Sequence, residues 1–235
     1  MSKLQEAFIS WSGGKDSCMA LHYSLQDPNW RIAGLQTTIS KEYNRISIHG
    51  VREELLEMQA ESLNMPLIKL YLDEMPDMLS YETQLTKANA DLLQMGVKNI
   101  VYGDIFLEDL RTYREGLLQK TDQRAVFPLW KRNTRELIFE FIDLGYKTII
   151  VSAQEGLQHL CGKIIDKELI DTLPAGIDPC GENGEFHTFV VNGPIFNKGL
   201  DVLTGELVFK PFQIDTDLHN ELPKGAWYID LVPNP

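Results

Sequence analysis

Residues 12–17 read SGGKDS and lie between an apolar, strand-like segment and a helix-like segment. Glycines permit backbone angles that bring successive N–H groups together, and a following helix adds unpaired N–H groups and the positive end of its dipole. Ser12 and Ser17 offer hydroxyl groups to phosphate oxygens, and Lys15 offers a mobile positive charge. The segment predicts a phosphate-binding loop; the alternative is a plain glycine turn in which Asp16 or Ser17 caps the helix.

Spacing excludes two other phosphate-binding patterns for this loop. A Walker A loop has Gly-x-x-x-x-Gly-Lys followed by Ser or Thr, whereas Asp16 follows Lys15 here. The Gly-x-Gly-x-x-Gly turn of dinucleotide-binding proteins does not match either. If the loop binds phosphate, it belongs to another class of nucleotide-binding protein.

A second dense segment, GENGEFHT, begins at Gly181. Within it, Glu182, Glu185 and His187 place two carboxylates and an imidazole close together, and Gly181 and Gly184 allow a sharp chain path. Such a cluster suits magnesium coordination, ammonium binding or proton transfer. Taken alone, an acidic glycine-rich segment is more often a solvated turn.

SGGKDS after a first strand resembles the PP-loop of the N-type ATP pyrophosphatases, which cleave ATP between the α and β phosphates. Together with GENGEFHT it resembles the diphthine:ammonia ligase family, in which a PP-loop domain is joined to a short C-terminal part carrying Gly-Glu-x-Gly-Glu-aromatic-His/Glu-Thr. Gly103, Ile105 and Arg111 match the family's Gly-x-Ile loop and the arginine after it, and residues 128–130 match its Pro-Leu-Trp. The resemblance extends over about residues 7–196.

This resemblance implies an ATP-dependent amide ligase that forms AMP and pyrophosphate. A substrate carboxylate attacks the α phosphorus, pyrophosphate leaves from the PP-loop, and ammonia displaces AMP from the acyl adenylate. The implied cofactors are ATP and Mg²⁺, with Asp16 and Asp104 as the expected metal ligands. Lys15, the loop amides and Mg²⁺ are expected to neutralise charge on the departing pyrophosphate.

The remaining site residues follow from the same motifs. The expected nucleotide-binding residues are Ser12, Gly13, Gly14, Lys15, Asp16, Ser17, Gly103 and Asp104. The expected catalytic residues are Lys15, Asp16, Glu182, Glu185 and His187.

The acceptor of ammonia is less well defined by the sequence. The run SIHGVR at 47–52 looks like the bacterial branch of the family, whose acceptor is unsettled, and the acidic stretch of members that act on elongation factor 2 is missing. Diphthine and a cobalamin-type or other metabolite therefore both stay open. We expect His49 and Arg52 to bind the acceptor. Arg111 and Arg114 are three residues apart on one predicted helix, so we expect them to face the site together and to bind phosphate or the acceptor's carboxylate.

Two other functions compete with the amide ligase. A PP-loop sulfur transferase acting on tRNA or a small molecule would depend on Cys161 or Cys180, but the chain has no C-x-x-C pair. A noncatalytic ATP- or AMP-binding module would have no need for the second motif. Cys18 and Cys180 are read as structural residues.

The composition of the chain indicates which kinds of partner it is expected to bind and in which cell compartment it is expected to act. The formal net charge of -12 and the lack of a Lys/Arg block argue against nucleic acid. No apolar run is long enough for a membrane span or for a signal peptide, and the three scattered cysteines suit a reducing compartment, so we expect a cytoplasmic protein without a membrane partner.

Short apolar runs alternate with amphipathic stretches from the first strand to KTIIVSA at 147–153. In the helix predicted after residue 50, for example, Val51, Leu55 and Met58 share one face. This alternation predicts an α/β fold with a mostly parallel sheet covered by helices on both faces. The family resemblance implies a Rossmann-like sheet of the adenine nucleotide alpha hydrolase type.

We expect an ATP-binding domain at 1–150 and a smaller, strand-containing part at 151–235. Gly and Pro become frequent after residue 153, and the extended segments that follow include a predicted hairpin turn at Thr204–Gly205. Aromatic residues in the C-terminal segment that begins at Lys224 are expected to be exposed and to form a homodimer contact.

Overall fold

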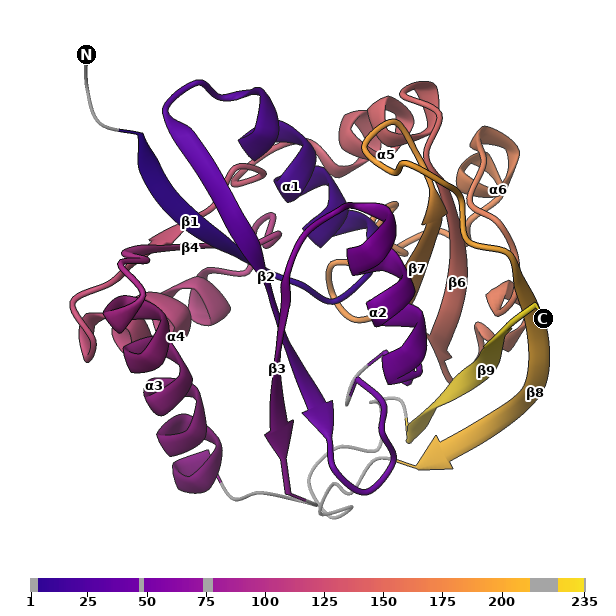
Figure 1. Cartoon of the computed structure of the whole chain (residues 1–235). Coiled ribbons are helices and arrows are strands. Elements are labelled where there is room, and N and C mark those ends of the chain that lie inside the picture. Colours follow the sequence, from indigo (N-terminus) through magenta and orange to yellow (C-terminus); the bar gives the residue numbers. More distant parts are fainter. Residues whose placement is uncertain (1–3, 47–48, 74–77, 212–223, 235) are drawn as a thin grey trace.

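The computed structural model describes residues 4–46, 49–73, 78–211 and 224–234 of the chain. Within them the chain forms two sheets, one parallel and one antiparallel, and helices α1 and α2 lie between these sheets (Figure 1). The α/β architecture predicted from the sequence, with a parallel sheet, flanking helices and a separate C-terminal set of strands, is confirmed.

The parallel sheet has the strand order β3-β2-β1-β4-β5. Its strands are β1 (Gln5–Ser10), β2 (Trp30–Ser40), β3 (Leu67–Leu72), β4 (Asn99–Val101) and β5 (Arg124–Val126). The helices between them are α1 (Lys15–Gln26), α2 (Glu53–Ser62), α3 (Met78–Gln94) and α4 (Glu108–Gln119).

Alternation along the central strands explains why both faces of this sheet are covered. Ala7 and Ile9 on β1 belong to the core that contains α1 and α2, whereas Phe8 points to a second core that includes Leu92 of α3 and Leu118 of α4. Successive side chains of a strand point to opposite faces, so an uninterrupted apolar run has to be buried on both sides. The two cores are the result.

β1 and β4 are parallel neighbours in this sheet. From β1 the chain first adds β2 and β3 on one side, and then adds β4 and β5 on the other side, so the strand order switches between β1 and β4. Ligands of such sheets bind beyond the carboxyl ends of the strands, at this switch point. The loop at 12–17 follows β1 and the segment that begins at Tyr102 follows β4. The topology therefore places both predicted nucleotide-binding segments side by side at the carboxyl ends of β1 and β4.

The antiparallel sheet has the order β7-β6-β9-β8. It follows α5 (Thr134–Asp143) and contains β6 (Lys147–Gln154), β7 (Phe186–Asn192), β8 (Val202–Pro211) and β9 (Gly225–Pro233), with a short 3₁₀ helix (Gln158–Leu160) and α6 (Lys167–Asp171) between β6 and β7. The expectation that 147–153 continues the parallel sheet is wrong, because this strand pairs with β7 and β9. A buried apolar run does not by itself indicate which sheet it joins.

Two further expectations for the C-terminal part are also wrong. Thr204–Gly205 is not a hairpin turn but lies inside β8, where the pairing with β9 shifts register between Thr204 and Leu207. The aromatic rings of β9 are half-buried: Trp227 lies 5.2 Å from the ring of Phe209, and Tyr228 lies against Gly50. The homodimer remains a prediction.

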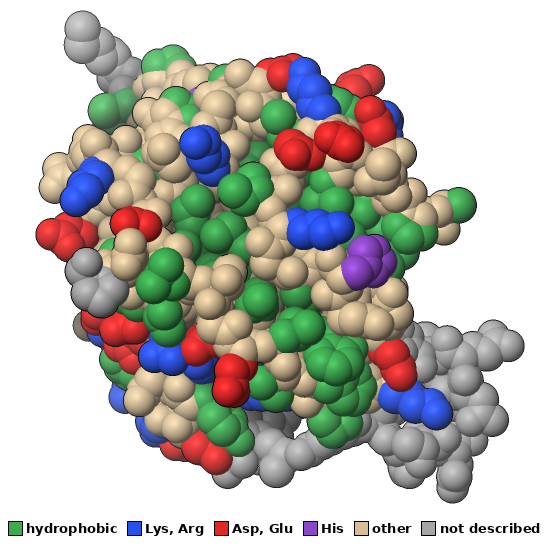
Figure 2. Space-filling model, turned by 90° about the vertical axis from the view of Figure 1, so that its right-hand side faces the viewer, with side chains coloured by type: hydrophobic (Ala, Val, Ile, Leu, Met, Phe, Trp, Pro, Cys, Tyr) green, Lys and Arg blue, Asp and Glu red, His purple; other side chains and the backbone are tan. Residues whose placement is uncertain are grey.

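The face on the side of the antiparallel sheet carries Lys and Arg side chains interspersed with Asp and Glu, without a continuous basic patch (Figure 2). Within the described part of the chain, no helix has the length and apolar character needed to cross a membrane.

Candidate active site

The loop at 12–17 makes its turn at Gly13, where φ is +75°. A Cβ atom there would lie 2.7 Å from Gln59 Oε1 and 2.9 Å from Leu56 Cδ2, so both conformation and space require glycine. Gly103, after β4, approaches the same loop: a Cβ on it would lie 2.6 Å from the carbonyl carbon of Asp16. The two segments are thus in close backbone contact.

Helix α1 begins directly after the loop and lacks a cap from its own N-cap residue. Gly14 occupies the N-cap position and has no side chain to accept a hydrogen bond. Instead, the backbone N–H of Lys15 donates to Oγ1 of Thr188, on β7, at 3.0 Å. The second motif therefore touches the first, and the N-terminus of α1 depends on a strand of the antiparallel sheet.

A cavity of about 680 Å³ opens at this junction. Ten of the residues predicted for the site line it, namely Ser12, Lys15, Asp16, Ser17, His49, Gly103, Asp104, Arg114, Glu182 and His187. Gly13 and Gly14 form the adjoining loop backbone, whereas Arg52, Arg111 and Glu185 do not line the cavity.

Two ion pairs lie along the cavity wall. Lys15 Nζ is 2.7 Å from Asp16 Oδ2, and Arg114 Nε is 2.9 Å from Asp104 Oδ2. Burial lowers the pKa of Lys15, but the carboxylate of Asp16 and other nearby anionic groups outweigh it, so the pKa is raised and the ammonium stays charged. The pKa of Asp16 is raised, because the effect of burial exceeds the opposing effect of the Lys15 charge.

Asp16 and Asp104 fit a magnesium site of the kind that phosphates complete. Both carboxylates line the same cavity, and Mg²⁺ is commonly held by one or two carboxylates together with substrate phosphates and water. Among the described residues, no group of three or more His, Cys, Asp and Glu side chains is arranged to hold a metal ion without such help.

Glu182 connects the second motif to the loop after β4. Its Oε1 accepts a hydrogen bond from the backbone N–H of Ile105 at 2.7 Å. Burial, together with the negative charge of Asp16, raises the pKa of Glu182 to about 7, while the amide of Ile105 acts in the opposite direction. This carboxyl group can therefore hold or release a proton near neutral pH.

Glu185 does not line the cavity and is bonded within its own loop. Its carboxylate accepts hydrogen bonds from the backbone N–H groups of Asp178 and Asn183, at 2.9 and 3.0 Å, and from the Asn183 side chain. The side chain is buried. Its observed contacts are those of a residue that shapes the 178–185 segment.

His49 and His187 meet at the cavity from different parts of the chain, and their rings are stacked. Burial, with the charge of Lys15 adding to it, lowers the pKa of His49 to about 4; a hydrogen bond with the backbone of Thr188 acts in the opposite direction. Burial also lowers the pKa of His187 well below its usual range, and His49 and Lys15 contribute. Both shifts favour the neutral imidazole at pH 7.

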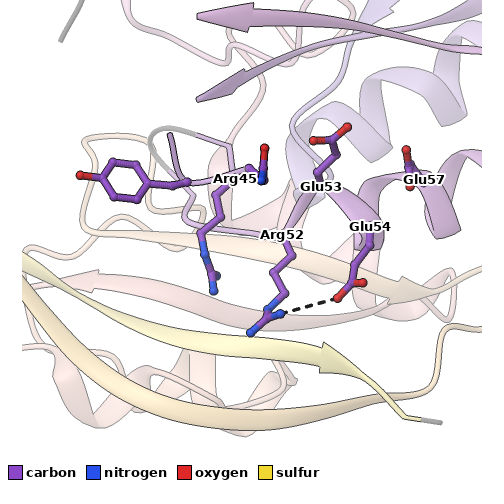
Figure 3. A pocket seen from close by; sticks show the side chains of 7 residues that line it. Arg45, Arg52, Glu53, Glu54 and Glu57 are labelled. Atoms are coloured by element: carbon purple, nitrogen blue, oxygen red, sulfur yellow. Dashed lines mark ion pairs between the residues drawn. The ribbon is translucent and has the colours of Figure 1, made fainter. Parts of the chain in front are cut away.

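Arg52 belongs to a different, shallower pocket of about 500 Å³ on the outer side of the loop before α2 (Figure 3). There Arg52 donates to both carboxylate oxygens of Asp230, at 2.7 and 3.1 Å, and Arg45 donates to the same carboxylate at 2.8 Å. Both arginines point toward β9 (Figure 3). These ion pairs fasten the loop that carries His49 to the antiparallel sheet.

Arg111 is likewise outside the cavity. Its guanidinium lies over the ring of Trp130, 4.6 Å from the centroid, and over the ring of Phe127 at 5.1 Å, and it donates to Glu115 at 2.8 Å. Of the two arginines predicted to share a face of α4, only Arg114 lines the cavity.

A second cavity of about 500 Å³ adjoins the first, and the residues that line both are Ser10, Ser12, His49, Tyr102, Leu110 and Arg114. Its other walls are mostly apolar or aromatic, but Gln36 Oε1 and Thr37 Oγ1 are buried there without a hydrogen-bond partner among the described residues. Buried polar atoms are normally satisfied, so these two atoms favour a ligand with matching groups.

The thiols do not line either cavity. Cys180 Sγ lies 3.2 Å from the carbonyl oxygen of Thr134, and burial raises the pKa of this thiol. Cys161 Sγ lies 3.8 Å from the carbonyl oxygen of Trp227. These contacts do not favour a sulfur carrier at the site.

Sequence reasoning missed several cavity residues. Thr188 and Asn183 lie within the second motif, and Tyr102 immediately precedes Gly103, so the motifs themselves were a usable signal for them. Leu107 and Leu110 carried no such signal, because leucines at the start of a helix are ordinarily core residues.

A glycine- and lysine-containing loop at the switch point of a parallel sheet defines an α/β nucleotide-binding protein. The model of the diphthamide synthase N-terminal domain matches residues 5–122, and that of the diphthamide synthase C-terminal domain matches residues 133–216. The chain therefore belongs to the diphthamide synthase family, and it is an ATP-dependent ligase of the ATP pyrophosphatase type.

Individual relatives agree with this assignment. The chain is 28% identical to diphthine--ammonia ligase of Bos taurus over 222 residues and 28% identical to that of Homo sapiens over 229 residues. It is 26% identical to the Danio rerio protein of the same name over 221 residues. The matches cover 84% of this chain, with 82% of the Bos taurus and Homo sapiens proteins and 86% of the Danio rerio protein.

Proposed function

We propose that this protein adenylates a substrate carboxylate with ATP and transfers ammonia to it, so that an amide, AMP and pyrophosphate are formed. The observation that supports this most directly is the meeting of the two motifs. Thr188 bonds the first amide of α1, and Glu182 and His187 line the same cavity as Lys15 and Asp16. A protein that only binds nucleotide has no use for proton-transferring groups at the phosphates.

ATP would occupy both cavities. Its phosphates lie at the loop after β1, where the N-terminus of α1 and the Lys15 ammonium favour anions. Its nucleoside lies in the adjoining cavity, where Gln36 Oε1 and Thr37 Oγ1 have no hydrogen-bond partner in the described part of the chain and lie between apolar walls. Mg²⁺ held by Asp16 and Asp104 would neutralise phosphate charge.

The chain's own groups suit the two chemical steps. An acceptor carboxylate attacks the α phosphorus, and Lys15 stabilises the negative charge of the departing pyrophosphate. Ammonia then attacks the acyl carbon, a C–N bond forms, and the C–O bond to AMP breaks. The proton that the new nitrogen loses passes to the neutral imidazole of His187, which lies at the cavity.

The acceptor is a carboxylate on a small molecule or on a protein. The names of the relatives indicate diphthine, whereas the segment at 47–52 favours the bacterial branch and another acceptor; residues 47 and 48 lie outside the described residues. Of the four predicted acceptor residues, His49 and Arg114 line the cavity and stay candidates for direct contact. The cysteines are free thiols, which suits a reaction in the reducing cytoplasm.

The experiment is a product analysis by anion exchange after incubation with Mg-ATP, ammonium chloride and one of two acceptor sources. One source is elongation factor 2 that carries diphthine, and the other is a deproteinised extract of the cells that produce the protein. Lys15→Ala serves as the site variant. Lys120→Ala serves as the matched control, because Lys120 pairs with Glu82 at the surface, away from the cavity.

AMP and pyrophosphate that form only with an acceptor source, and that disappear in Lys15→Ala but not in Lys120→Ala, would support the proposal and would name the acceptor class. ADP as the product would contradict the cleavage site. If the protein binds ATP but does not turn it over with either acceptor source, the alternative function, a noncatalytic ATP- or AMP-binding module, would be favoured.

A further inference from the structure

Gln59 is a polar residue at the centre of the molecule. It lies on the inner face of α2 and its exposed fraction is 0%. Both ends of its amide are hydrogen-bonded: Oε1 accepts from Trp11 Nε1 at 3.0 Å, and Nε2 donates to the carbonyl oxygens of Gly13 at 3.0 Å and Val190 at 2.6 Å. A buried amide is costly unless it is paired in this way.

The three hydrogen-bond partners of Gln59 lie on two segments that border the loop at 12–17. Trp11 and Gly13 belong to the PP-loop segment, and Val190 belongs to β7, the strand that also carries Thr188. Val190 N in turn donates to the Gly13 carbonyl oxygen at 2.9 Å. The turn of the loop is therefore held between α2 and β7, and a Cβ on Gly13 would collide with Gln59.

We propose that Gln59 is a positioning residue of the nucleotide site. By fixing the carbonyl group of Gly13 and the indole of Trp11 on the inner side, it keeps the loop in the conformation in which Ser12, Lys15 and Ser17 line the cavity. Preorganised donors bind an anion better because no free energy is spent on ordering them. This inference rests on the proposed function in one respect, namely that the loop binds the phosphates of ATP.

A matched control separates this role from ordinary core stability. Gln123 is also buried, with an exposed fraction of 4%; its Nε2 donates to the Val97 carbonyl oxygen at 2.9 Å and its Oε1 accepts from Thr121 at 2.7 Å. Gln123 directly precedes β5 and so lies at the amino ends of the parallel strands, whereas the loop at 12–17 lies at their carboxyl ends. Loss of this amide should destabilise the fold without reaching the nucleotide.

The test compares Gln59→Met with Gln123→Met, because methionine conserves most of the volume and removes the hydrogen bonds. The affinities for Mg-ATP and for pyrophosphate are measured by isothermal titration calorimetry, and the unfolding midpoints are measured in parallel. We expect both variants to lose stability but only Gln59→Met to bind Mg-ATP and pyrophosphate about tenfold or more weakly. Gln59→Glu should bind no better than Gln59→Met, because a carboxylate cannot donate to the two carbonyl groups.

Equal affinity of Gln59→Met and the wild type would overturn the inference, as would an equal loss in Gln123→Met. If Gln59→Met does not fold, Trp11→Phe removes one of the three hydrogen bonds, and unchanged affinity in that variant would have the same meaning. A wild-type protein that binds neither Mg-ATP nor pyrophosphate would contradict the proposed function first and the inference with it.

Discussion

The imidazole rings of His49 and His187 are stacked, with centroids 4.6 Å apart and planes 27° from parallel. One ring comes from the loop before α2 and the other from β7, so the contact joins the two halves of the cavity. Lys15 adds a positive charge nearby, and a proton on either ring would be repelled by it. Both rings are half-buried beside the loop at 12–17, and their lowered pKa values favour the neutral form.

We therefore predict that neither ring is protonated at neutral pH. The folded-state pKa values lie below the ordinary value of about 6.5, so the stability that depends on neutral rings is present above that value and decreases as the pH falls. The measurement is an NMR titration of the histidine Cε1–H signals from pH 8 to pH 5, assigned with His49→Gln and His187→Gln. Both signals should stay in their neutral positions over this range.

A midpoint near pH 6.5 for either signal would contradict this prediction. In His49→Gln, the pKa of His187 should rise, because the neighbouring imidazole no longer opposes its protonation.

Glu182 should make the folded protein less stable as the pH rises. Its pKa of about 7 in the folded state exceeds the unfolded value of about 4.3, so the folded state binds more protons between these values and its stability falls over that interval. Glu182→Gln removes this ionisation and can still accept from Ile105. We predict that the variant is more stable than the wild type at pH 8, by on the order of 2 kcal/mol, and about equally stable at pH 4.

Urea denaturation at pH 4, 6 and 8 measures this difference. Glu206→Gln, at an exposed position on β8, controls for the loss of one negative charge. A stability difference that does not change with pH would show that Glu182 does not hold a proton in the folded state near neutral pH.

Asp230 should stabilise the protein at neutral pH through Arg45 and Arg52. Burial alone would raise its pKa, but the hydrogen bonds from Arg52 and Arg45 outweigh burial and lower the pKa to about 2. A carboxylate with a depressed pKa contributes stability above its unfolded value of about 4, and this contribution is lost as the pH falls toward 2. Asp230→Asn should cost on the order of 1–2 kcal/mol at pH 7 and progressively less in acid.

Asp73→Asn is the control, because the ion pair of Asp73 with Lys41 is exposed and should contribute much less. Thermal unfolding at pH 7 and at pH 3 compares the variants. Equal losses for Asp230→Asn and Asp73→Asn at pH 7 would argue against a fastening role for Asp230.

Gly103 should not tolerate a side chain. A Cβ at this position would lie 2.6 Å from the carbonyl carbon of Asp16 and 2.8 Å from Ser17 N, and these are backbone atoms that cannot turn aside. Gly103→Ala should therefore cost about 1–3 kcal/mol and weaken ATP binding by displacing the start of α1.

Gly116→Ala provides the opposite case within α4. Apart from the chain neighbours and the backbone of α4 itself, no atom of the described residues lies within 4 Å of the place that a Cβ would take on Gly116, so alanine should stabilise the helix by about 0.5–1 kcal/mol. Chemical denaturation and calorimetric titration with ATP measure both effects. A Gly103→Ala variant with wild-type stability and affinity would mean that the two loops can separate at little cost.

Much of the site could be predicted because its chemistry is local. In SGGKDS, the glycines, the lysine and the start of a helix are adjacent in the chain, so their combined property, anion binding, follows from residue types and spacing. The same holds for the alternation of strands and helices through residue 143. Periodicity correctly put Met58 on the face of α2 that packs against the core, but it gave no reason to bury Gln59.

Residue types and their order along the chain were enough to predict the class of fold and the place of the loop at 12–17 between a strand and a helix, since both depend on neighbours within a few positions. They did not predict that Thr188 caps α1, that Gln59 holds Gly13, that Asp230 fastens the loop of His49, or that β6 leaves the parallel sheet. The side-chain contacts among these join residues 46 to 185 positions apart. They arise when the two sheets pack around α1 and α2, because a buried polar group has to find a partner wherever packing places one.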